Sequence, residues 1–447
     1  MRSTSTFEQG FNVRTLNYLG SKLRLLDFIE SQVERVTGNN NGVCDLFAGS
    51  GCVSYKLSSH FPVTACDIQH YSKVLCEALL GSHALSDEKI GSFLAGLSDP
   101  KRIRLEEIYA PLIKLEEEAI AKKDIDVLAD IVEHGSLEVF RRERRISSVS
   151  SAQEKVYADL MALGIPREDD FISRNYGGVY FSYRQAMTID AILSAIRQRT
   201  SQDEKTVFLA SLLSTASDVV DTVGKHFAQP IKARDSAGHI KPLVYNKALC
   251  DKTIDVKVLY AEWVRKYVSL PHGRHSHRTI QGDYMGCLKM LTDDVRTVYA
   301  DPPYTREHYS RFYHVLETIS RGDMPDMATV KIHGEVRVSN GLYRRDRHQS
   351  PFCIRSKAPS AFNSMFKEVS RAKRNLLLSY SPYDESKKTH PRVVTMRQLV
   401  SWAREYFKDV DLVSAGKFAH NKLNSSVHRL EASEEAEMII VCTGARG

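Results

Sequence analysis

The 447-residue sequence lacks the features that mark secreted, membrane and nucleotide-hydrolysing proteins. Its eight cysteines include no C-x-x-C pair, which argues against a zinc ribbon or a disulfide framework and favours a reducing cytoplasm. No segment is apolar enough to cross a membrane, and the polar start from Met1 to Gln9 does not resemble a signal peptide. The usual phosphate-loop lysine is absent, which disfavours ATP hydrolysis. We therefore expect a cytoplasmic protein.

The composition is that of an ordinary globular protein with a mildly basic surface. Hydrophobic residues make up 42% of the chain and charged residues 26%, and the length allows two or more cores. The net charge of +7 favours a polyanionic partner only weakly. Function must therefore be inferred from particular stretches.

The most informative stretch is T-V-Y-A-D-P-P-Y, residues 297 to 304. Its first half predicts a short buried strand, which the two prolines stop, so that Asp301 lies at the strand's C-terminal tip. Pro302 and Pro303 have a fixed φ and no N–H group, which makes the turn stiff. The Asp301 carboxylate and Pro302 carbonyl could accept both hydrogens of one amino group, and a base could stack on Tyr304. Taken alone, the stretch is explained equally well by a structural turn with a packed tyrosine.

A second group of motifs lies near the N-terminus. N-Y-L-G-S-K, residues 17 to 22, predicts a turn before a helix with a buried stripe from Leu26 to Val36. The apolar strand that follows, residues 43 to 47, leads into A-G-S-G, whose glycines let the backbone pass close to a ligand. A second strand ends in Asp67, which could accept both hydroxyls of a ribose or could cap a helix.

In this order, N-Y-L-G-S-K, D-L-F-A-G-S-G, C-D-I, G-D-Y at 282 to 284 and D-P-P-Y resemble the motifs of the Dam-type, alpha-group DNA adenine N6-methyltransferases, which use S-adenosyl-L-methionine. Many members of that family have an aromatic residue followed by Ala-Gly or Gly-Gly where this chain has Tyr18-Leu19. The resemblance implies a cofactor site formed by Tyr18, Lys22, Asp45, Phe47, Gly49, Gly51, Asp67 and Asp283. It also implies a target-base site formed by Asp301, Pro302, Pro303 and Tyr304.

Within this resemblance each cofactor residue has an expected role. Tyr18 and Lys22 border the pocket, while Asp45 and the two glycines cradle the methionine part. Asp67 holds the ribose, and Asp283 binds the amino group of the cofactor's adenine.

Two stretches are candidates for nucleic-acid contacts. Residues 171 to 181, F-I-S-R-N-Y-G-G-V-Y-F, resemble a hairpin that presents Arg174, Asn175 and Tyr176 to DNA, although a hairpin with its aromatics packed in a core fits equally well. Residues 331 to 374 carry eleven Lys or Arg against three Asp or Glu, with glycines and prolines that predict a loop. Its central arginines, Arg344, Arg345 and Arg347, could clamp phosphates beside the target base.

The expected fold is α/β, a Rossmann-like class I methyltransferase. Residues 376 to 380 predict a central strand, and residues 411 to 418 and 437 to 443 a terminal antiparallel pair, giving a mostly parallel sheet with a reversed edge strand. The long interval between the motifs predicts an inserted, mainly helical DNA-recognition region. Helical patterns cover residues 105 to 129, 182 to 199 and 203 to 221 within it. We expect a first catalytic part at 1–82, the inserted region at 83–278 and a second catalytic part at 279–447.

These observations lead to one functional hypothesis. The chain is expected to transfer a methyl group from S-adenosyl-L-methionine to a flipped-out adenine of double-stranded DNA. It would serve either a restriction–modification system with a companion endonuclease or as an orphan modification enzyme. The alternatives are a cytosine N4 or RNA adenine methyltransferase, a protein glutamine methyltransferase, and a non-catalytic DNA-binding regulator. His275-x-His277 could bind a metal, but no carboxylate or cysteine cluster accompanies it, so we predict no metal site.

Overall fold

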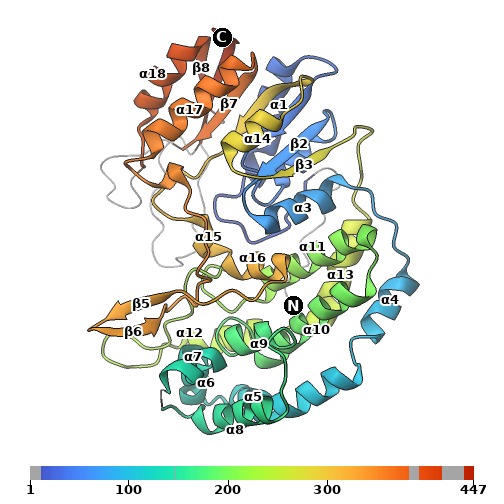
Figure 1. Ribbon diagram of the computed structural model, residues 1–447, viewed down its shortest axis with the longest axis vertical. Helices are drawn as coiled ribbons and strands as arrows, with labels where there is room; N and C mark the ends of the chain where they lie inside the picture. Colours follow the sequence, from blue (N-terminus) through green and yellow to red (C-terminus); the bar gives the residue numbers. More distant parts are fainter. Residues whose placement is uncertain (1–11, 145, 382–391, 415–436) are drawn as a thin grey trace. The chain divides into compact units, whose positions relative to one another are not determined.

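The computed structural model describes residues 12–144, 146–381, 392–414 and 437–447 (Figure 1). The chain folds into two compact units. Unit 1 contains the residues up to Ser82, Leu270–Ser310 and those from His348 onward, and unit 2 contains His83–Ser269 and Arg311–Arg347. The expected division differs from the observed units at residues 270 to 278, which belong to unit 1, and at residues 311 to 347, which belong to unit 2. The latter segment packs with the inserted region, because His314 lies 3.1 Å from the Phe227 carbonyl and the Tyr343 hydroxyl donates to the Ala228 carbonyl.

Unit 1 is built on a seven-stranded sheet in the order β3-β2-β1-β4-β7-β9-β8 (Figure 1). Its strands are β1 (Gly42–Asp45), β2 (Val63–Asp67), β3 (Arg278–Gln281), β4 (Val295–Ala300), β7 (Asn375–Tyr380), β8 (Phe407–Ser414) and β9 (Met438–Ala445). The pairs from β3 to β7 are parallel, and β9 is antiparallel to both β7 and β8. The predicted, largely parallel sheet is confirmed, but the reversed strand lies inside the sheet and not at its edge.

Helices cover both faces of this sheet. They are α1 (Leu26–Thr37), preceded by the 3-10 turn η1 (Leu23–Leu25), α2 (Cys52–Leu57), α3 (His70–Leu80), α14 (Tyr284–Met290), α17 (Ala358–Arg371) and α18 (Met396–Tyr406), with the short α15 (Tyr309–Phe312) and η3 (Pro351–Cys353). Because successive strand residues point to opposite faces, Val298 packs with α14, α17 and α18, whereas Tyr299 packs with α1, α2 and α3. The two cores hold the sheet as the middle of three layers.

The N-terminal helix matches its sequence pattern. Leu26, Ile29 and Val33 of α1 are buried, and Gly38 follows the helix with φ of 72°, a conformation that suits glycine. Strand β3 and the 3-10 turns have no counterpart in the sequence predictions. Of the predicted strand at 411 to 418, residues 415 to 418 lie outside the described residues.

Unit 2 is mainly helical. Its helices are α4 (Asp87–Ala95), α5 (Pro100–Lys122), α6 (Ile125–His134), α7 (Leu137–Glu143), α8 (Ser150–Ala162), α9 (Phe171–Tyr176), α10 (Tyr183–Arg199), α11 (Gln202–Val219), α12 (Leu243–Lys247), α13 (Val256–Val268) and α16 (His314–Arg321), with the π-helical η2 (Ala248–Lys252) and the antiparallel hairpin β5 (Thr329–Ile332) and β6 (Glu335–Val338). The predicted helices at 105 to 129, 182 to 199 and 203 to 221 are confirmed as α5 with α6, α10 and α11.

The predicted hairpin at 171 to 181 is wrong, because its first half forms the helix α9. The Asp190 carboxylate accepts hydrogen bonds from the backbone N–H groups of Ile172 and Ser173, at 2.9 and 2.8 Å, and so satisfies the first turn of that helix. This acceptor lies on α10, where the local sequence of 171 to 181 gives no indication of it. Within the described part of the chain, none of the helices has the length and apolar character that a membrane span requires.

Candidate functional site

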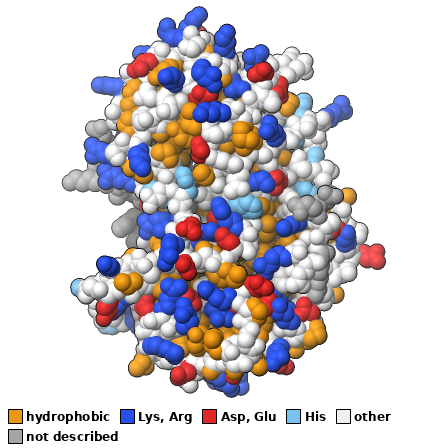
Figure 2. Space-filling view, viewed as in Figure 1, with side chains coloured by type: hydrophobic (Ala, Val, Ile, Leu, Met, Phe, Trp, Pro, Cys, Tyr) orange, Lys and Arg blue, Asp and Glu red, His pale blue; other side chains and the backbone are white. Residues whose placement is uncertain are grey.

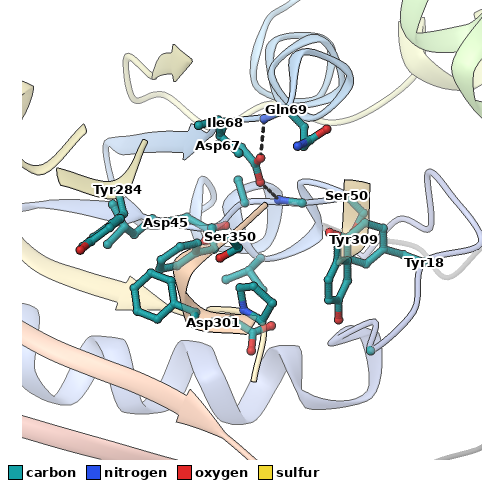
Figure 3. A pocket seen from close by; sticks show the side chains of 18 of the residues that line it. Tyr18, Asp45, Ser50, Asp67, Ile68, Gln69, Tyr284, Asp301, Tyr309 and Ser350 are labelled. Carbon is teal, nitrogen blue, oxygen red and sulfur yellow. Dashed lines mark hydrogen bonds between the residues drawn. The ribbon is translucent and has the colours of Figure 1, made fainter. Parts of the chain in front are cut away.

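A cavity of about 370 Å³ in unit 1 opens beside the carboxyl ends of β1, β2 and β4 (Figure 3). Its volume falls in the range of small-molecule sites. The predicted residues that line it are Tyr18, Lys22, Asp45, Phe47, Gly49, Asp67, Asp283, Asp301 and Pro303. The other predicted residues, Gly51, Pro302 and Tyr304, lie outside its lining. The glycine loop and the D-P-P-Y turn meet at one pocket because β1 and β4 are parallel neighbours in the sheet.

Glycine is required at the two positions of the loop for different structural reasons. Gly49 has φ of 55°, and a Cβ atom there would lie 2.6 Å from the Tyr18 hydroxyl. Gly51 has φ of 77°, and its Cβ would lie 2.7 Å from Leu79 Cδ1 of α3. Gly49 thus shapes the pocket wall, whereas Gly51 allows α2 to begin close against α3.

Asp67 ties the glycine loop to the end of β2. Its carboxylate accepts hydrogen bonds from the backbone N–H groups of Gly49, at 2.9 Å, and Gln69, at 2.8 Å (Figure 3). A carboxylate offers about four acceptor positions. The side chain therefore fixes the loop and keeps capacity for hydroxyl groups in the pocket.

Asp45 is a buried carboxyl group on the pocket floor. It is 1% exposed and accepts a hydrogen bond of 2.7 Å from the Ser54 hydroxyl. Burial raises its pKa from 3.8 to about 7; the Ser54 bond opposes this shift, and the charges of Asp301 and Asp67 add to it. Near neutral pH this group exchanges between its acid and its carboxylate form.

Aromatic rings form the pocket wall beside Asp283. Phe47 and Tyr284 are stacked with their centroids 6.5 Å apart, and both contact Phe352, at 5.3 and 5.0 Å. Asp283 caps α14 by accepting from the N–H groups of Met285 and Gly286, each at 3.0 Å. Sequence reasoning missed Phe352, which lies in a predicted loop far from the motifs.

Lys22 links the D-P-P-Y turn to the last strand. Its Nζ lies 3.0 Å from Asp301 and 2.7 Å from Glu437, and the residue is only 4% exposed. Burial lowers the pKa of Lys22, but the two carboxylates more than offset burial and hold it well above its usual value. Lys22 is thus not a solvated surface lysine, and the charge it neutralises belongs to the protein itself.

Glu437 is a site-associated residue that sequence reasoning missed. It is 2% exposed, precedes β9, and accepts hydrogen bonds from Lys22 and from the Ser379 hydroxyl, at 2.9 Å. In the sequence it is one of several glutamates within E-E-A-E. Only the reversed strand β9 brings it to the pocket.

Tyr304 packs against two neighbouring side chains next to the pocket. Its ring centroid lies 5.2 Å from that of Tyr380, and the Arg392 guanidinium carbon lies 4.6 Å from it. The Tyr304 carbonyl also accepts a bond of 3.2 Å from the Val393 N–H group. These contacts fix the turn that presents Asp301 and Pro303 to the cavity.

The structure separates the predicted nucleic-acid contacts into buried and accessible residues. Arg174, Asn175 and Tyr176 are at most 5% exposed; Arg174 pairs with Asp170, and Asn175 bonds to the Phe171 carbonyl. They offer no surface to a nucleic acid, and this prediction is wrong.

The arginines of the basic segment also differ from one another. Arg344 is 4% exposed and forms two bonds to Asp323, at 3.1 and 2.7 Å, so it is a structural ion pair and not a phosphate contact. Arg345 is exposed and pairs with Asp326 at 3.2 Å. Arg347 lies over the ring of Tyr343, 4.5 Å from its centroid. Of the three predicted contacts, only Arg345 and Arg347 reach the surface of unit 2.

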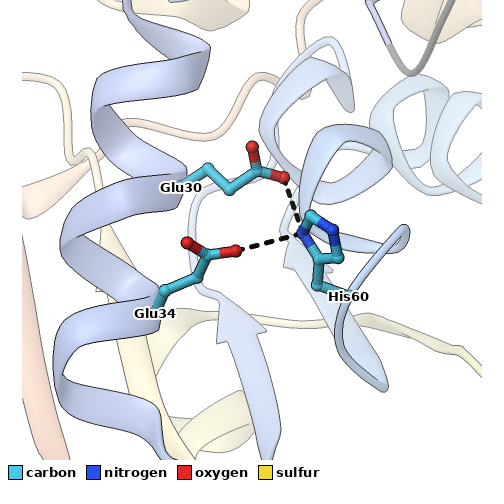
Figure 4. Close-up of side chains that lie close together, drawn as sticks. All are labelled: Glu30, Glu34 and His60. Carbon is cyan, nitrogen blue, oxygen red and sulfur yellow. Dashed lines mark hydrogen bonds and ion pairs between the residues drawn. The ribbon is translucent and has the colours of Figure 1, made fainter.

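Among the described residues, one group combines three possible metal ligands: Glu30, Glu34 and His60 (Figure 4). The His60 Nδ1 atom lies 3.1 and 3.2 Å from the two carboxylates, which are hydrogen-bond distances. Lys56 also pairs with Glu30, at 3.1 Å. We interpret the group as a surface ion-pair cluster between α1 and the turn after α2. His277 has a different role, since its Nδ1 accepts from the Val63 N–H group at 3.2 Å.

Comparisons with known proteins find similarity in the segments that form the pocket. The family model described as D12 class N6 adenine-specific DNA methyltransferase matches residues 18–123 and 275–384, which carry the motifs and the pocket. Modification methylase LlaI of Lactococcus lactis subsp. lactis is 23% identical over 95% of this chain and 54% of that protein. The Type II methyltransferase M.NlaIII of Neisseria lactamica is 25% identical over 79% of this chain and 80% of that protein.

The matched segments contain the ordered motifs and line the pocket, and they are similar to a D12 class N6 adenine-specific DNA methyltransferase. This similarity agrees with the resemblance inferred from the motifs. The family description indicates an enzyme that acts on adenine in DNA. This chain spans about half the length of LlaI, 54%.

Proposed function

We propose that the chain transfers a methyl group from S-adenosyl-L-methionine to the N6 atom of a flipped-out adenine in double-stranded DNA, as the modification enzyme of a restriction–modification system. The observation that carries the proposal is the single cavity lined by both the glycine loop and the D-P-P-Y turn. The names of LlaI and M.NlaIII support a modification role. The family description favours adenine over cytosine and DNA over RNA.

The residues present fit the proposed cofactor. Gly49 leaves room that a Cβ atom would fill, Asp67 offers acceptors for hydroxyls, and Asp45 offers a carboxylate for an ammonium group. Phe47 and Phe352 supply apolar faces next to Asp283 for a purine. When bound, the cofactor supplies an electrophilic methyl group.

The catalytic turn would act on the adenine amino group through hydrogen bonds. The Asp301 carboxylate and the Pro302 carbonyl accept the two N6 hydrogens, which favours a nitrogen lone pair directed away from the ring plane. Lys22, which is itself held by Glu437, pairs with Asp301 and fixes the position of its carboxylate. An ionised aspartate is too weak a base to deprotonate a neutral aryl amine, so the proton leaves N6 after the transfer.

The two units would divide the work of binding DNA. A base inside a duplex cannot reach a pocket at a strand end, and flipping it out costs on the order of a few kcal/mol. Contacts to the backbone phosphates and stacking on Tyr304 offset that cost. We assign the chemistry to unit 1 and DNA recognition to the mainly helical unit 2. A cytoplasmic location is supported by the eight cysteines, all of which are free thiols.

The test is incubation of the chain with labelled cofactor and genomic DNA, followed by digestion to nucleosides. Label in N6-methyladenine is the expected result, and Asp301→Ala is expected to lose it while cofactor binding is retained. Label in N4-methylcytosine, or in RNA only, would replace the proposal by one of the alternative substrates. Absence of label with intact DNA binding would favour a non-catalytic regulator.

A further inference from the structure

Lysine and arginine side chains are spread over much of the visible face of the molecule, with acidic side chains among them (Figure 2). Overall charge therefore does not single out a DNA-binding surface. The geometry around Tyr343 in unit 2 is more specific. The guanidinium carbons of Arg347 and Arg311 lie 4.5 and 5.1 Å from the centroid of its ring, and Arg311 Nη2 donates a bond of 3.1 Å to its hydroxyl oxygen.

Tyr343 is held rigidly by the rest of unit 2. Its hydroxyl donates to the Ala228 carbonyl, its own carbonyl accepts from the Ala328 N–H group at 2.7 Å, and the ring of the buried His314 lies 5.2 Å away. A Cβ atom on Gly341 would lie 2.3 Å from Tyr343 Cζ, so glycine is required beside the ring. The tyrosine is a fixed platform for both arginines.

The charges of these two arginines are not balanced within the described protein. Arg344 and Arg345, in the same segment, have Asp323 and Asp326 as partners. Among the residues that the structure describes, neither Arg311 nor Arg347 forms a salt bridge; Arg347 Nε donates to the Arg344 carbonyl at 3.0 Å. Burial lowers the pKa of Arg347, and the nearby charge of Arg311 adds to this shift, whereas Tyr343 opposes it. Two neighbouring cations without a carboxylate partner favour the binding of an external anion.

Both guanidinium groups can be reached from solvent. Arg311 is exposed and Arg347 is half-buried. Arg311 and Tyr343 also line a groove of unit 2 together with Gln229, Lys232 and Asn340. Two glutamates of this groove are engaged elsewhere, Glu133 with Arg234 and Glu143 with the Val338 N–H group. The groove therefore presents amide and cationic donors next to the arginine pair.

We propose that Arg311 and Arg347 bind backbone phosphates of the DNA substrate, with Tyr343 as the platform that positions both side chains. The proposal rests on the proposed function, because it takes DNA as the substrate. A guanidinium presents several N–H donors in a plane and suits the oxygens of a phosphodiester. The contact fixes the position of the duplex on unit 2 and carries no base specificity.

The test measures the affinity of the full chain for a DNA duplex at a series of salt concentrations. Arg311→Ala and Arg347→Ala should each lower the slope of log K against log salt by roughly one unit at most, and weaken binding to all sequences alike. Arg311→Lys should keep the slope because the charge remains. The matched control is Arg265→Ala, since Arg265 is an exposed arginine of unit 2 that pairs with Asp87 at 2.7 Å.

The outcomes separate this proposal from the proposed function. One outcome is that the unmodified chain binds and methylates DNA while both alanine variants keep its salt slope. In that case the proposed phosphate contact is contradicted and the methyltransferase assignment stands. If the unmodified chain neither binds nor methylates DNA, the proposed function fails and this proposal fails with it. Circular dichroism of each variant identifies loss of folding. If the alanine variants do not fold, the salt slopes of Arg311→Lys and Arg347→Lys are compared with those of the neutral variants Arg311→Gln and Arg347→Gln. Equal slopes for the charged and neutral variants would then contradict the phosphate contact.

Discussion

Lys22 of unit 1 and the Arg311–Arg347 pair of unit 2 are cations in opposite surroundings. Lys22 is 4% exposed and lies within 3.0 Å of two carboxylates, so its charge is neutralised inside the protein. The two arginines share one tyrosine ring, and neither forms a salt bridge with a described residue. A cation with internal partners fixes protein groups in place, whereas cations without them favour an external anion.

This difference fits the two kinds of binding that the proposed function requires. The amino group of adenine is neutral, and a site for it needs aligned hydrogen-bond acceptors. The Asp301 carboxylate is such an acceptor, and its contact to Lys22 fixes its orientation. The DNA backbone is a polyanion, and a site for it needs accessible positive charge.

Asp301→Ala should have the largest effect. It removes an acceptor for the adenine amino group, and we expect methyl transfer to fall by about 10²- to 10³-fold, as for the loss of one well-placed polar group in other active sites. Cofactor affinity should remain within about twofold, since Asp67 and the glycine loop are unchanged. Single-turnover transfer and equilibrium binding of the cofactor measure the two quantities. Near-normal transfer would show that Asp301 does not contact the amino group.

Lys22→Met should mainly affect folding. It leaves Glu437, which is 2% exposed, without its cationic partner, and the loss of one member of a buried pair costs about 3–5 kcal/mol. Urea unfolding measures this free energy. The control is the double variant Lys22→Met with Glu437→Gln, which removes the buried charge as well and should recover part of the stability. Equal stability of the single and double variants would mean that Glu437 does not depend on Lys22.

Asp45 should make cofactor binding depend on pH. Its pKa of about 7 means that the acid form predominates below pH 7, and pairing with the ammonium group of the cofactor requires the carboxylate. Affinity should therefore rise as pH increases towards 7, by at most about tenfold per pH unit, and level off above it. Titration calorimetry across this range measures the effect. Asp45→Asn is the control, because the dependence should disappear; a profile unchanged in that variant would assign it to another group.

The sequence predicted the parts of the site in which residues adjacent in the chain determine the position of the side chain. Asp301 follows a strand and precedes two prolines, so its position at a strand end can be inferred locally. Gly49 and Asp67 lie in loops after parallel strands, which open α/β sheets place at one edge. Their meeting at one pocket followed from that rule.

The parts that were missed depend on partners far away in the sequence. Glu437 reaches Lys22 across 415 positions, and Arg311 reaches Tyr343 across 32. Residues 171 to 176 have the composition of a strand, yet Asp190 on another helix caps them as α9. Likewise, a run of arginines does not show which of them Asp323 or Asp326 neutralises. Tertiary contacts decide these cases.

Arg344→Ala should have the smallest effect and is the closest test of the comparison, because Arg344 is three residues from Arg347 but has a carboxylate partner. The variant loses two bonds to Asp323, whose side chain is 38% exposed, and one bond each to the Asp346 carbonyl and the Thr318 hydroxyl. The folded state should therefore lose about 1–2 kcal/mol. Because Arg344 itself is 4% exposed, the salt dependence of DNA binding should not change. Thermal unfolding and the salt titration are measured on the same preparation. The salt dependence of Arg344→Ala could instead fall to the same slope of log K against log salt as that of Arg347→Ala. Pairing with a carboxylate would then not distinguish structural arginines from phosphate-binding arginines in this segment.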